Sequence, residues 1–142
     1  ANMNLPNQRP CTGVLTINLG AIRRNWQHLR DKMALNARCG AVIKANAYGL
    51  GADQVGRCLE AAGCQRFFVA TVKEGIAARM ALSDAVDIYI FDGVSRDQLL
   101  DCQKHRLTPV LFTFEQLRCW SQIAKENPEM RCAIKLDTGM HR

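Results

Sequence analysis

The sequence of 142 residues lacks the features that would assign it to a membrane or a secretory class. No stretch approaches the roughly 20 apolar residues that a membrane-spanning helix needs, so we expect no membrane association. The segment Ala1–Pro6 has no charged stretch followed by an apolar run, so no signal peptide is recognisable there. Internal repeats and low-complexity segments are also missing. We therefore expect a cytoplasmic protein.

The cysteines lack the pattern of a disulfide framework or a metal site. There are seven, an odd number, and none forms a C-x-x-C pair. We expect them to be buried free thiols in a reducing compartment. They are Cys11, Cys39, Cys58, Cys64, Cys102, Cys119 and Cys132.

The net charge of +6 is not concentrated anywhere. Basic residues are scattered singly or in twos, and Arg23–Arg24 is the one adjacent Lys/Arg pair. A nucleic-acid-binding surface requires clustered basic residues with interleaved aromatic residues. We therefore expect no nucleic-acid partner, and the hydrophobic content of 48% indicates a globular domain with one sizeable core.

The chain instead contains a regular alternation of short apolar runs and amphipathic segments. The runs are rich in Val, Ile and Phe, which is typical of buried parallel strands. The predicted strands are Gly40–Lys44, Arg66–Val72, Asp87–Phe91, Thr108–Thr113 and Arg131–Leu136. The predicted helices are Leu19–Met33, Asp53–Ala62, Lys73–Leu82, Arg96–His105 and Phe114–Asn127, and Val14–Ile17 is an isolated strand.

Single residues predict where some of these helices begin and end. Asp53 is a candidate N-cap and Gly63 a candidate C-terminal stop. In the last helix, Leu117, Trp120 and Ile123 share one apolar face.

The alternation permits two α/β folds, a doubly wound sheet or part of a (β/α)₈ barrel. A complete barrel has eight strands and about 250 residues. Five predicted strands in 142 residues would make up only part of one, and we expect the chain to stop before the barrel closes.

The most informative stretch is Ala41–Gly51, with the sequence AVIKANAYGLG. Lys44 ends an apolar run, where a barrel strand would deliver its amine to the active-site mouth. Small residues follow and leave room for a flat ligand, and Tyr48 adds a hydroxyl. A desolvated lysine amine suits Schiff-base chemistry. The competing interpretation is an ordinary solvated lysine.

Two motifs make the sequence resemble the alanine racemases, which use pyridoxal phosphate (PLP). The stretch VIKANAYG resembles their PLP-lysine signature, and Lys135–Arg142, KLDTGMHR, resembles the motif of their fifth barrel strand. The Ile17-Asn18-Leu19 stretch is also similar to the family's N-terminal opening. Leu50 departs from the pattern, because many members carry histidine there.

The resemblance implies roles for four residues. Lys44 would be the Schiff-base lysine and one of two acid/base groups. Tyr48 would bind the cofactor phosphate, and Arg142 would bind the cofactor and the substrate carboxylate, which suits a planar, permanently charged fork. Lys135 corresponds to a lysine that many members carbamylate, and the resulting anion would orient Arg142. An unmodified strand lysine is the alternative at that position. We expect no metal site.

The resemblance also implies a domain organisation. Residues 19–142 would form about five of the eight strands of a PLP-binding (β/α)₈ barrel. Residues 1–18 would carry a strand that pairs with a C-terminal β-domain outside this chain. The family takes its second acid/base, a tyrosine, from that domain of the partner subunit. We therefore expect a homodimer and no racemisation by this chain alone. A second polypeptide, or a chain nicked after Arg142, would account for the rest.

The implied activity is interconversion of L- and D-alanine, either to supply D-alanine for peptidoglycan or to catabolise it. A racemase of serine or of a basic amino acid remains an alternative. PLP-dependent decarboxylases of basic amino acids share the barrel, and their lysine motif is similar at Val-Lys-Ala-Asn, but they lack the continuation seen here. A non-catalytic PLP-binding protein is the non-enzymatic alternative.

Overall fold

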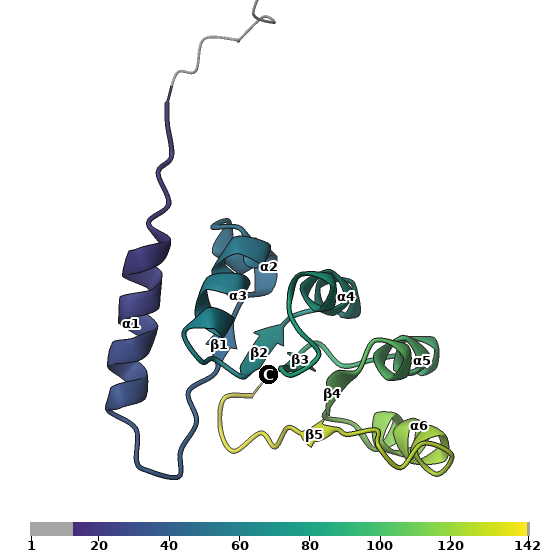
Figure 1. Ribbon diagram of the computed structural model, residues 1–142. Coiled ribbons are helices and arrows are strands. Elements are labelled where there is room, and N and C mark those ends of the chain that lie inside the picture. The colour runs from purple at the N-terminus through teal and green to yellow at the C-terminus, as the bar shows by residue number, and fades with distance from the viewer. Residues whose placement is uncertain (1–12, 142) are drawn as a thin grey trace, which may run out of the picture.

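The computed structural model describes residues 13–141, which form strands that alternate with helices (Figure 1). The strands are β1 (Ala41–Val42), β2 (Arg66–Val69), β3 (Asp87–Ile90), β4 (Leu107–Leu111) and β5 (Ala133–Ile134). The helices are α1 (Leu19–Asp31), α2 (Lys44–Tyr48), α3 (Ala52–Ala61), α4 (Val72–Ala81), α5 (Arg96–Lys104) and α6 (Phe114–Ala124). The five strands and the five longer helices confirm the predicted alternation, with boundaries that differ from the predicted ones by at most three residues.

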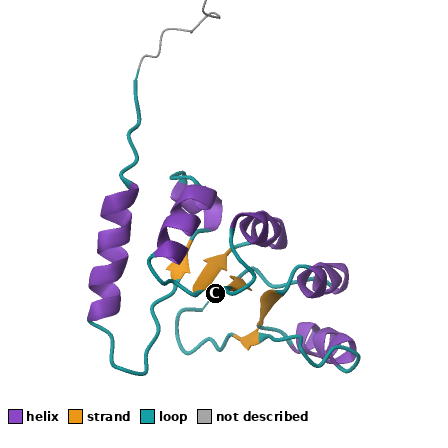
Figure 2. Ribbon diagram, in the orientation of Figure 1, coloured by secondary structure: helices purple, strands orange, loops and turns teal. Residues whose placement is uncertain are grey.

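The strands form one parallel sheet in the order β1-β2-β3-β4-β5. In a doubly wound sheet the strand order reverses at a switch point, and helices cover both faces of the sheet. Here each strand pairs with the next in sequence, and helices α3 to α6 form an outer arc around the curved sheet (Figures 1 and 2). The sheet is therefore part of a (β/α)₈ barrel, as predicted.

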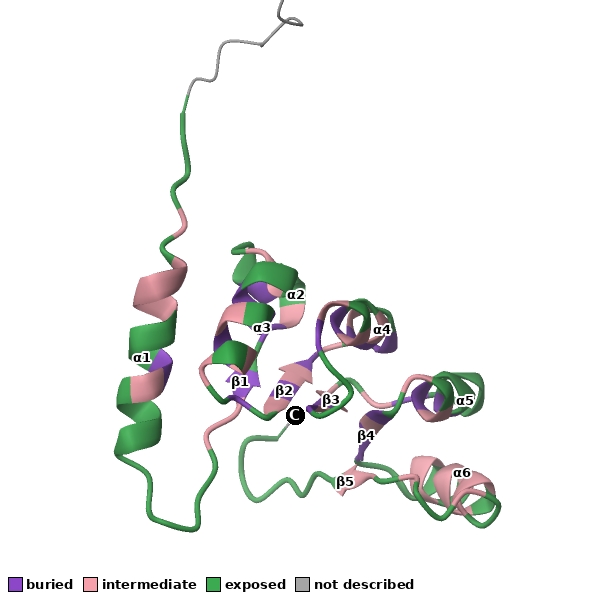
Figure 3. Ribbon diagram, viewed as in Figure 1, coloured by how far each residue is buried: buried purple, intermediate pink, exposed green. Residues whose placement is uncertain are grey.

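The two faces of the sheet differ in burial. In β2 and β3 the residues that face the helices are almost fully buried, and they alternate with half-buried residues on the inner face (Figure 3). Ile90 is an example of the first kind, and a Cβ on Gly75 of α4 would lie 2.6 Å from its Cδ1, so α4 packs directly on the strand. On the inner face, Phe68 stacks on Tyr89 and Phe91, with centroid distances of 4.8 and 5.2 Å.

The ends of α3 show one correct and one wrong prediction. Gly63, at φ +99°, closes a Schellman motif in which Cys64 N–H donates to Leu59 O at 2.9 Å, so the predicted stop is confirmed. The predicted N-cap at Asp53 is wrong. Helix α3 begins earlier, after Gly51, because the side chain of Asn46 already accepts the Ala52 N–H at 2.8 Å.

The two ends of the described chain are less enclosed. Leu117, Trp120 and Ile123 of α6 pack against the core as predicted, but no residue of α6 is fully buried. Residues 13–18 carry no strand in the structure, and Val14 is 86% exposed. The predicted pairing of this segment with a C-terminal β-domain stays a prediction, and residues 1–12 lie outside the described part. No helix within residues 13–141 has the length and apolar character to cross a bilayer.

Candidate active site

The predicted site residues follow the carboxyl ends of the strands. All five strands are parallel, so these ends meet at one rim of the sheet, where barrel enzymes hold their active sites. One residue, Ile43, separates Lys44 from the end of β1 at Val42, and Lys135 directly follows β5. The fold therefore brings the two predicted lysines to the same rim, at opposite ends of the strand order.

Lys44 is half-buried at this rim, and its amine has no hydrogen-bond or ion-pair partner among residues 13–141. The glycines that follow leave space: a Cβ added at Gly49 or Gly51 would meet no atom within 4 Å. A primary amine without a competing carboxylate, beside open space, is accessible to a carbonyl compound.

The backbone after Lys44 adopts a conformation that sequence analysis did not predict. Ala45, Asn46, Ala47 and Tyr48 have φ values from +50° to +56°, which makes α2 a left-handed turn. The left-handed conformation costs L-residues roughly 1–2 kcal/mol each, and consecutive non-glycine examples are rare. Backbone strain of this kind persists only where surrounding contacts hold it, and it concentrates at functional sites.

Three contacts hold this turn. At its start, Ala45 N–H donates to Glu74 Oε1 at 2.9 Å. In its middle, Asn46 Oδ1 accepts from Ala52 at 2.8 Å, and the Ala47 side chain is only 3% exposed. Glu74 was missed in the sequence, although Thr71-x-x-Glu74 is a capping-box signature and α4 does begin with that box.

Tyr48 and Lys135 lie at the rim with their polar groups exposed. Tyr48 is 64% exposed, and its hydroxyl has no hydrogen-bond partner among residues 13–141. Lys135 Nζ lies 5.5 Å from the centroid of the Phe112 ring, a cation–π distance. Lys135 also lines a cavity of about 140 Å³ with residues of β4, β5 and α6. Arg142 lies outside the described residues.

The described residues do not enclose the predicted site in one cavity. Lys135 lines the cavity near β5, whereas a separate hollow of about 400 Å³ lies beside the left-handed turn, against Leu50, Gly51 and Ile17. Lys44 lines neither of them. The rim is therefore an open surface on which Tyr48 and Lys135 are exposed and Lys44 is half-buried.

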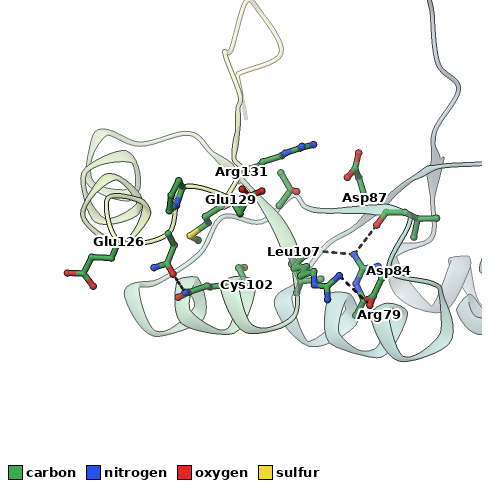
Figure 4. Close-up of a pocket in the computed structure, with 15 residues that line it drawn as sticks. Arg79, Asp84, Asp87, Cys102, Leu107, Glu126, Glu129 and Arg131 are labelled. Atoms are coloured by element: carbon green, nitrogen blue, oxygen red, sulfur yellow. Dashed lines mark hydrogen bonds and ion pairs between the residues drawn. The ribbon is translucent and has the colours of Figure 1, made fainter.

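A cavity of about 560 Å³ lies at the opposite, amino end of β3 and β4 (Figure 4). Its walls carry side chains of both charges, and Arg79 is tied to the backbone. The Arg79 guanidinium donates to the carbonyls of Ser83 at 2.6 Å, Val86 at 2.9 Å, Arg106 at 3.1 Å and His105 at 3.3 Å. Burial lowers the pKa of Arg79. These contacts join loops, so we assign this end a structural role.

The cysteines also show no reactive pattern. The six in residues 13–141 are free, as predicted, but only Cys64 and Cys102 are buried. Burial raises the pKa of Cys102, on the wall of the large cavity, to about 12. Burial also raises the pKa of the Cys64 and Cys132 thiols. The thiolate is the nucleophilic form, so these groups are poor nucleophiles near neutral pH.

Comparisons with known proteins agree with this geometry. A family model described as the alanine racemase N-terminal domain matches residues 17–142. A catabolic alanine racemase of Agrobacterium fabrum is 42% identical over 132 residues, which cover 92% of this chain and 34% of that protein. Alanine racemase 3 of Salmonella typhi is 38% identical over 141 residues, or 99% of this chain and 38% of that protein.

Solved structures show the same likeness. The alanine racemase of Bartonella henselae, crystallised with covalently bound pyridoxal phosphate, superimposes with a TM-score of 0.83 at 31% identity. The enzyme of E. faecalis gives a TM-score of 0.81 at 30% identity. Both matches cover 89% of this chain, and 37% and 34% of those chains. The chain thus spans about a third of the length of the proteins that it matches.

Proposed function

The chain belongs to the alanine racemase family, and from that premise we propose that the protein interconverts L- and D-alanine with pyridoxal phosphate as its cofactor. The observation that supports this most directly is Lys44, whose unpartnered amine lies at the carboxyl-end rim beside a strained turn. Free thiols in the chain favour a reducing, cytoplasmic location.

The groups at the rim fit the chemistry of the cofactor. An aldehyde requires an accessible primary amine, which Lys44 provides. A phosphate group requires an exposed hydrogen-bond donor, and the Tyr48 hydroxyl is one. The open space at Gly49 and Gly51 lets a ligand approach the backbone closely. We assign Lys44 as the covalent attachment point and Tyr48 as a phosphate ligand.

Bound pyridoxal phosphate supplies an electron sink that stabilises negative charge at the substrate α-carbon. The protein's own work is then to orient the amino acid and to move one proton. Lys44 Nζ would take or return that proton on one face of the α-carbon. Arg142, which lies outside the described residues, would bind the substrate carboxylate and the cofactor.

Lys135 is proposed to be carbamylated and to orient Arg142. Lys135 Nζ lies 5.5 Å from the centroid of the Phe112 ring, and a carbamate on that nitrogen would place a negative charge where the cation–π contact is now. A mass increase of one CO₂ equivalent on the Lys135 peptide, preserved by rapid work-up, is the expected result. Its absence at ambient bicarbonate would leave Lys135 as an ordinary cation.

Racemisation requires a second acid/base on the opposite face of the α-carbon, and neither tyrosine of this chain is available for that role. Tyr48 is assigned to the phosphate, and Tyr89 is stacked on Phe68. We therefore propose that the second base comes from another part of the protein or from a second polypeptide, across a homodimer. The described chain alone should not racemise alanine.

The test is borohydride reduction of the full-length protein with PLP, followed by intact mass and peptide mapping. A pyridoxyl adduct on Lys44 is expected. An adduct on another lysine, or none, would rule the assignment out. Incubation of the holoenzyme with either enantiomer of alanine in D₂O should then exchange the α-hydrogen. Bound cofactor without exchange would favour a non-catalytic binding protein, and release of CO₂ would favour a decarboxylase.

The same exchange assay separates alanine from its rivals. Serine and the basic amino acids should exchange more slowly than alanine at equal concentration. A higher kcat/KM for any of them would change the substrate but not the reaction class.

A further inference from the structure

Glu74 connects two loops at the rim through a single carboxylate. Its Oε1 accepts the Ala45 N–H at 2.9 Å. Its Oε2 accepts the N–H groups of Ala70 at 2.8 Å and Thr71 at 3.4 Å, in the loop between β2 and α4. The first contact crosses 29 residues of sequence and reaches the peptide nitrogen bonded to the Lys44 carbonyl carbon.

The neighbouring β/α units show what is distinctive about this residue. Helices α5 and α6 begin with the same kind of cap, in which Gln98 Oε1 accepts from Ser95 at 2.9 Å and Gln116 Oε1 accepts from Phe112 at 3.0 Å. A glutamine side chain has one acceptor oxygen, which is enough for a cap. A carboxylate has two, so Glu74 can cap its own helix with one oxygen and bind a different loop with the other.

The Ala45 N–H is a suitable point at which to fix Lys44. Within the left-handed turn the backbone bonds run from Ala47 to Ile43 O and from Gly49 to Ala45 O, so the Ala45 N–H is directed out of the turn toward Glu74. The position of the Lys44 amine depends on this peptide plane, because the plane sets the backbone from which the side chain extends. Four consecutive left-handed residues hold such a plane only while outside contacts fix it.

We propose that Glu74 is a positioning residue for Lys44, a role that rests on the proposed function of Lys44 as the cofactor-binding lysine. Its carboxylate fixes the first peptide of the strained turn to the start of α4 and so sets where the Lys44 amine meets the cofactor. Glu74 takes no part in proton transfer.

The test is Glu74→Gln in the full-length protein, because this variant retains one acceptor for the cap and turns the other into a donor. An amide NH₂ cannot accept the Ala45 N–H, so the contact with the turn is lost while the cap can persist. We expect the affinity for PLP, measured by absorbance titration of apoprotein, to fall about tenfold. Borohydride trapping at Lys44 should slow in parallel. The Ala45 amide should exchange with D₂O at the rate of an exposed loop.

The matched control is Gln98→Ala, which removes the equivalent cap in the next β/α unit, where no remote loop is bound. It is a larger truncation than Glu74→Gln, yet we expect PLP affinity and trapping to stay within about twofold of wild type. Equal effects of the two variants would mean that Glu74 acts only as a cap and would overturn the proposal.

Two further outcomes separate this inference from the proposed function. If wild-type protein forms no adduct on Lys44, the proposed function fails and this inference fails with it. If wild type forms the adduct and Glu74→Gln matches the control, only the inference fails. Should Glu74→Gln not fold, exchange in wild type decides: peptides covering residues 43–48 must show slow exchange at Ala45, and fast exchange there overturns the proposal.

Discussion

Side chains at the two ends of helix α4 bind backbone groups at the two ends of the sheet, one as a hydrogen-bond acceptor and the other as a donor. At its first turn, Glu74 is an acceptor that gathers three backbone N–H groups at the carboxyl-end rim. At its last turn, Arg79 is a donor that gathers four carbonyls at the amino end. The first clamp holds a strained turn beside a reactive amine, and the second joins loops around a cavity whose buried thiol is neutral.

In this helix, the contact that serves the proposed function lies at the first turn and the contacts that stabilise the fold lie at the last turn. The charge signs follow the free groups of the backbone, since a helix leaves N–H groups without intrahelical partners in its first turn and carbonyls without them in its last turn. Backbone strain is concentrated at the end where Lys44 lies, with four consecutive left-handed residues there and one, Arg106, at the amino end. We therefore expect changes at the rim to alter chemistry, and changes at the amino end to alter the free energy of unfolding.

The largest effect should come from Lys44→Ala in the full-length protein. Loss of an acid/base group lowers the racemisation rate by about 10²- to 10⁴-fold. The free energy of unfolding should stay within about 0.5 kcal/mol of wild type, because the amine has no partner among the described residues. Alanine racemisation followed by chiral chromatography, together with urea denaturation, checks both parts. If Lys44→Ala also lowered the free energy of unfolding substantially, the rim would contribute to stability as well as to chemistry, and the two ends would not differ as proposed.

The amino end should be closed to thiol reagents. Burial raises the pKa of Cys102 to about 12, so near pH 8.5 its thiolate fraction is about a thousandfold below that of an exposed cysteine. Labelling of native protein with iodoacetamide, followed by peptide mapping, should find Cys102 modified last. Its rate should rise as pH rises toward 12. Labelling as fast as for the half-buried Cys119 would show that the amino-end cavity opens to reagent.

Arg79→Ala should destabilise the protein by about 2–4 kcal/mol, because it leaves four carbonyls without their charged donor. The rate of racemisation per folded molecule should be unchanged. Urea denaturation and active-site titration with borohydride measure the two quantities. A kcat that falls for folded protein would mean that the amino end contributes to chemistry.

Replacing alanine by glycine should raise the stability of the protein at one position near the rim and lower it at another. Ala45→Gly, in the left-handed turn, relieves strain and should stabilise the protein by about 1 kcal/mol. Ala77→Gly, on the exposed face of α4, should destabilise it by about 0.5–1 kcal/mol. Thermal unfolding of both variants is the measurement. Destabilisation by both would show that the turn after Lys44 is not strained.

The smallest effect should come from Asp84→Asn at the amino end. Asp84 pairs with Arg106 at 3.3 Å, but both side chains are about two-thirds exposed, at 66% and 68%. Exposed pairs contribute about 0–1 kcal/mol. Denaturation at low and high salt should show a small difference that disappears in high salt. A larger loss of stability would mean that this ion pair, and not the set of Arg79 hydrogen bonds, is the main contact that stabilises the amino end.

Much of this structure could be predicted because the sequence pattern is local. The short apolar runs located the five strands, and Gly63 predicted the C-terminal stop of α3 because a left-handed residue at that position suits glycine. The left-handed turn could not be predicted, since Ala45 and Ala47 favour ordinary helix. A rule of local preference fails there because contacts made elsewhere in the chain hold the backbone.

Glu74 shows the same limit within one side chain. Its cap with Thr71 is readable as a four-residue signature, but its second oxygen binds a residue 29 positions away, which no local pattern reports. Asp53 failed for a related reason, because the Asn46 side chain had already satisfied the first N–H of α3. Arg142 and residues 1–12 lie outside the described residues, so their predicted roles stay predictions.

The consecutive order of the strands also bears on how the protein is made. Each strand pairs with the one synthesised immediately before it, so every new unit emerging from the ribosome finds its docking surface already in place. Contacts between sequence neighbours keep loop-closure entropy small and favour rapid assembly. Glu74 and the turn that it holds belong to successive units, so the contact that sets the lysine's backbone requires no strand later than β2.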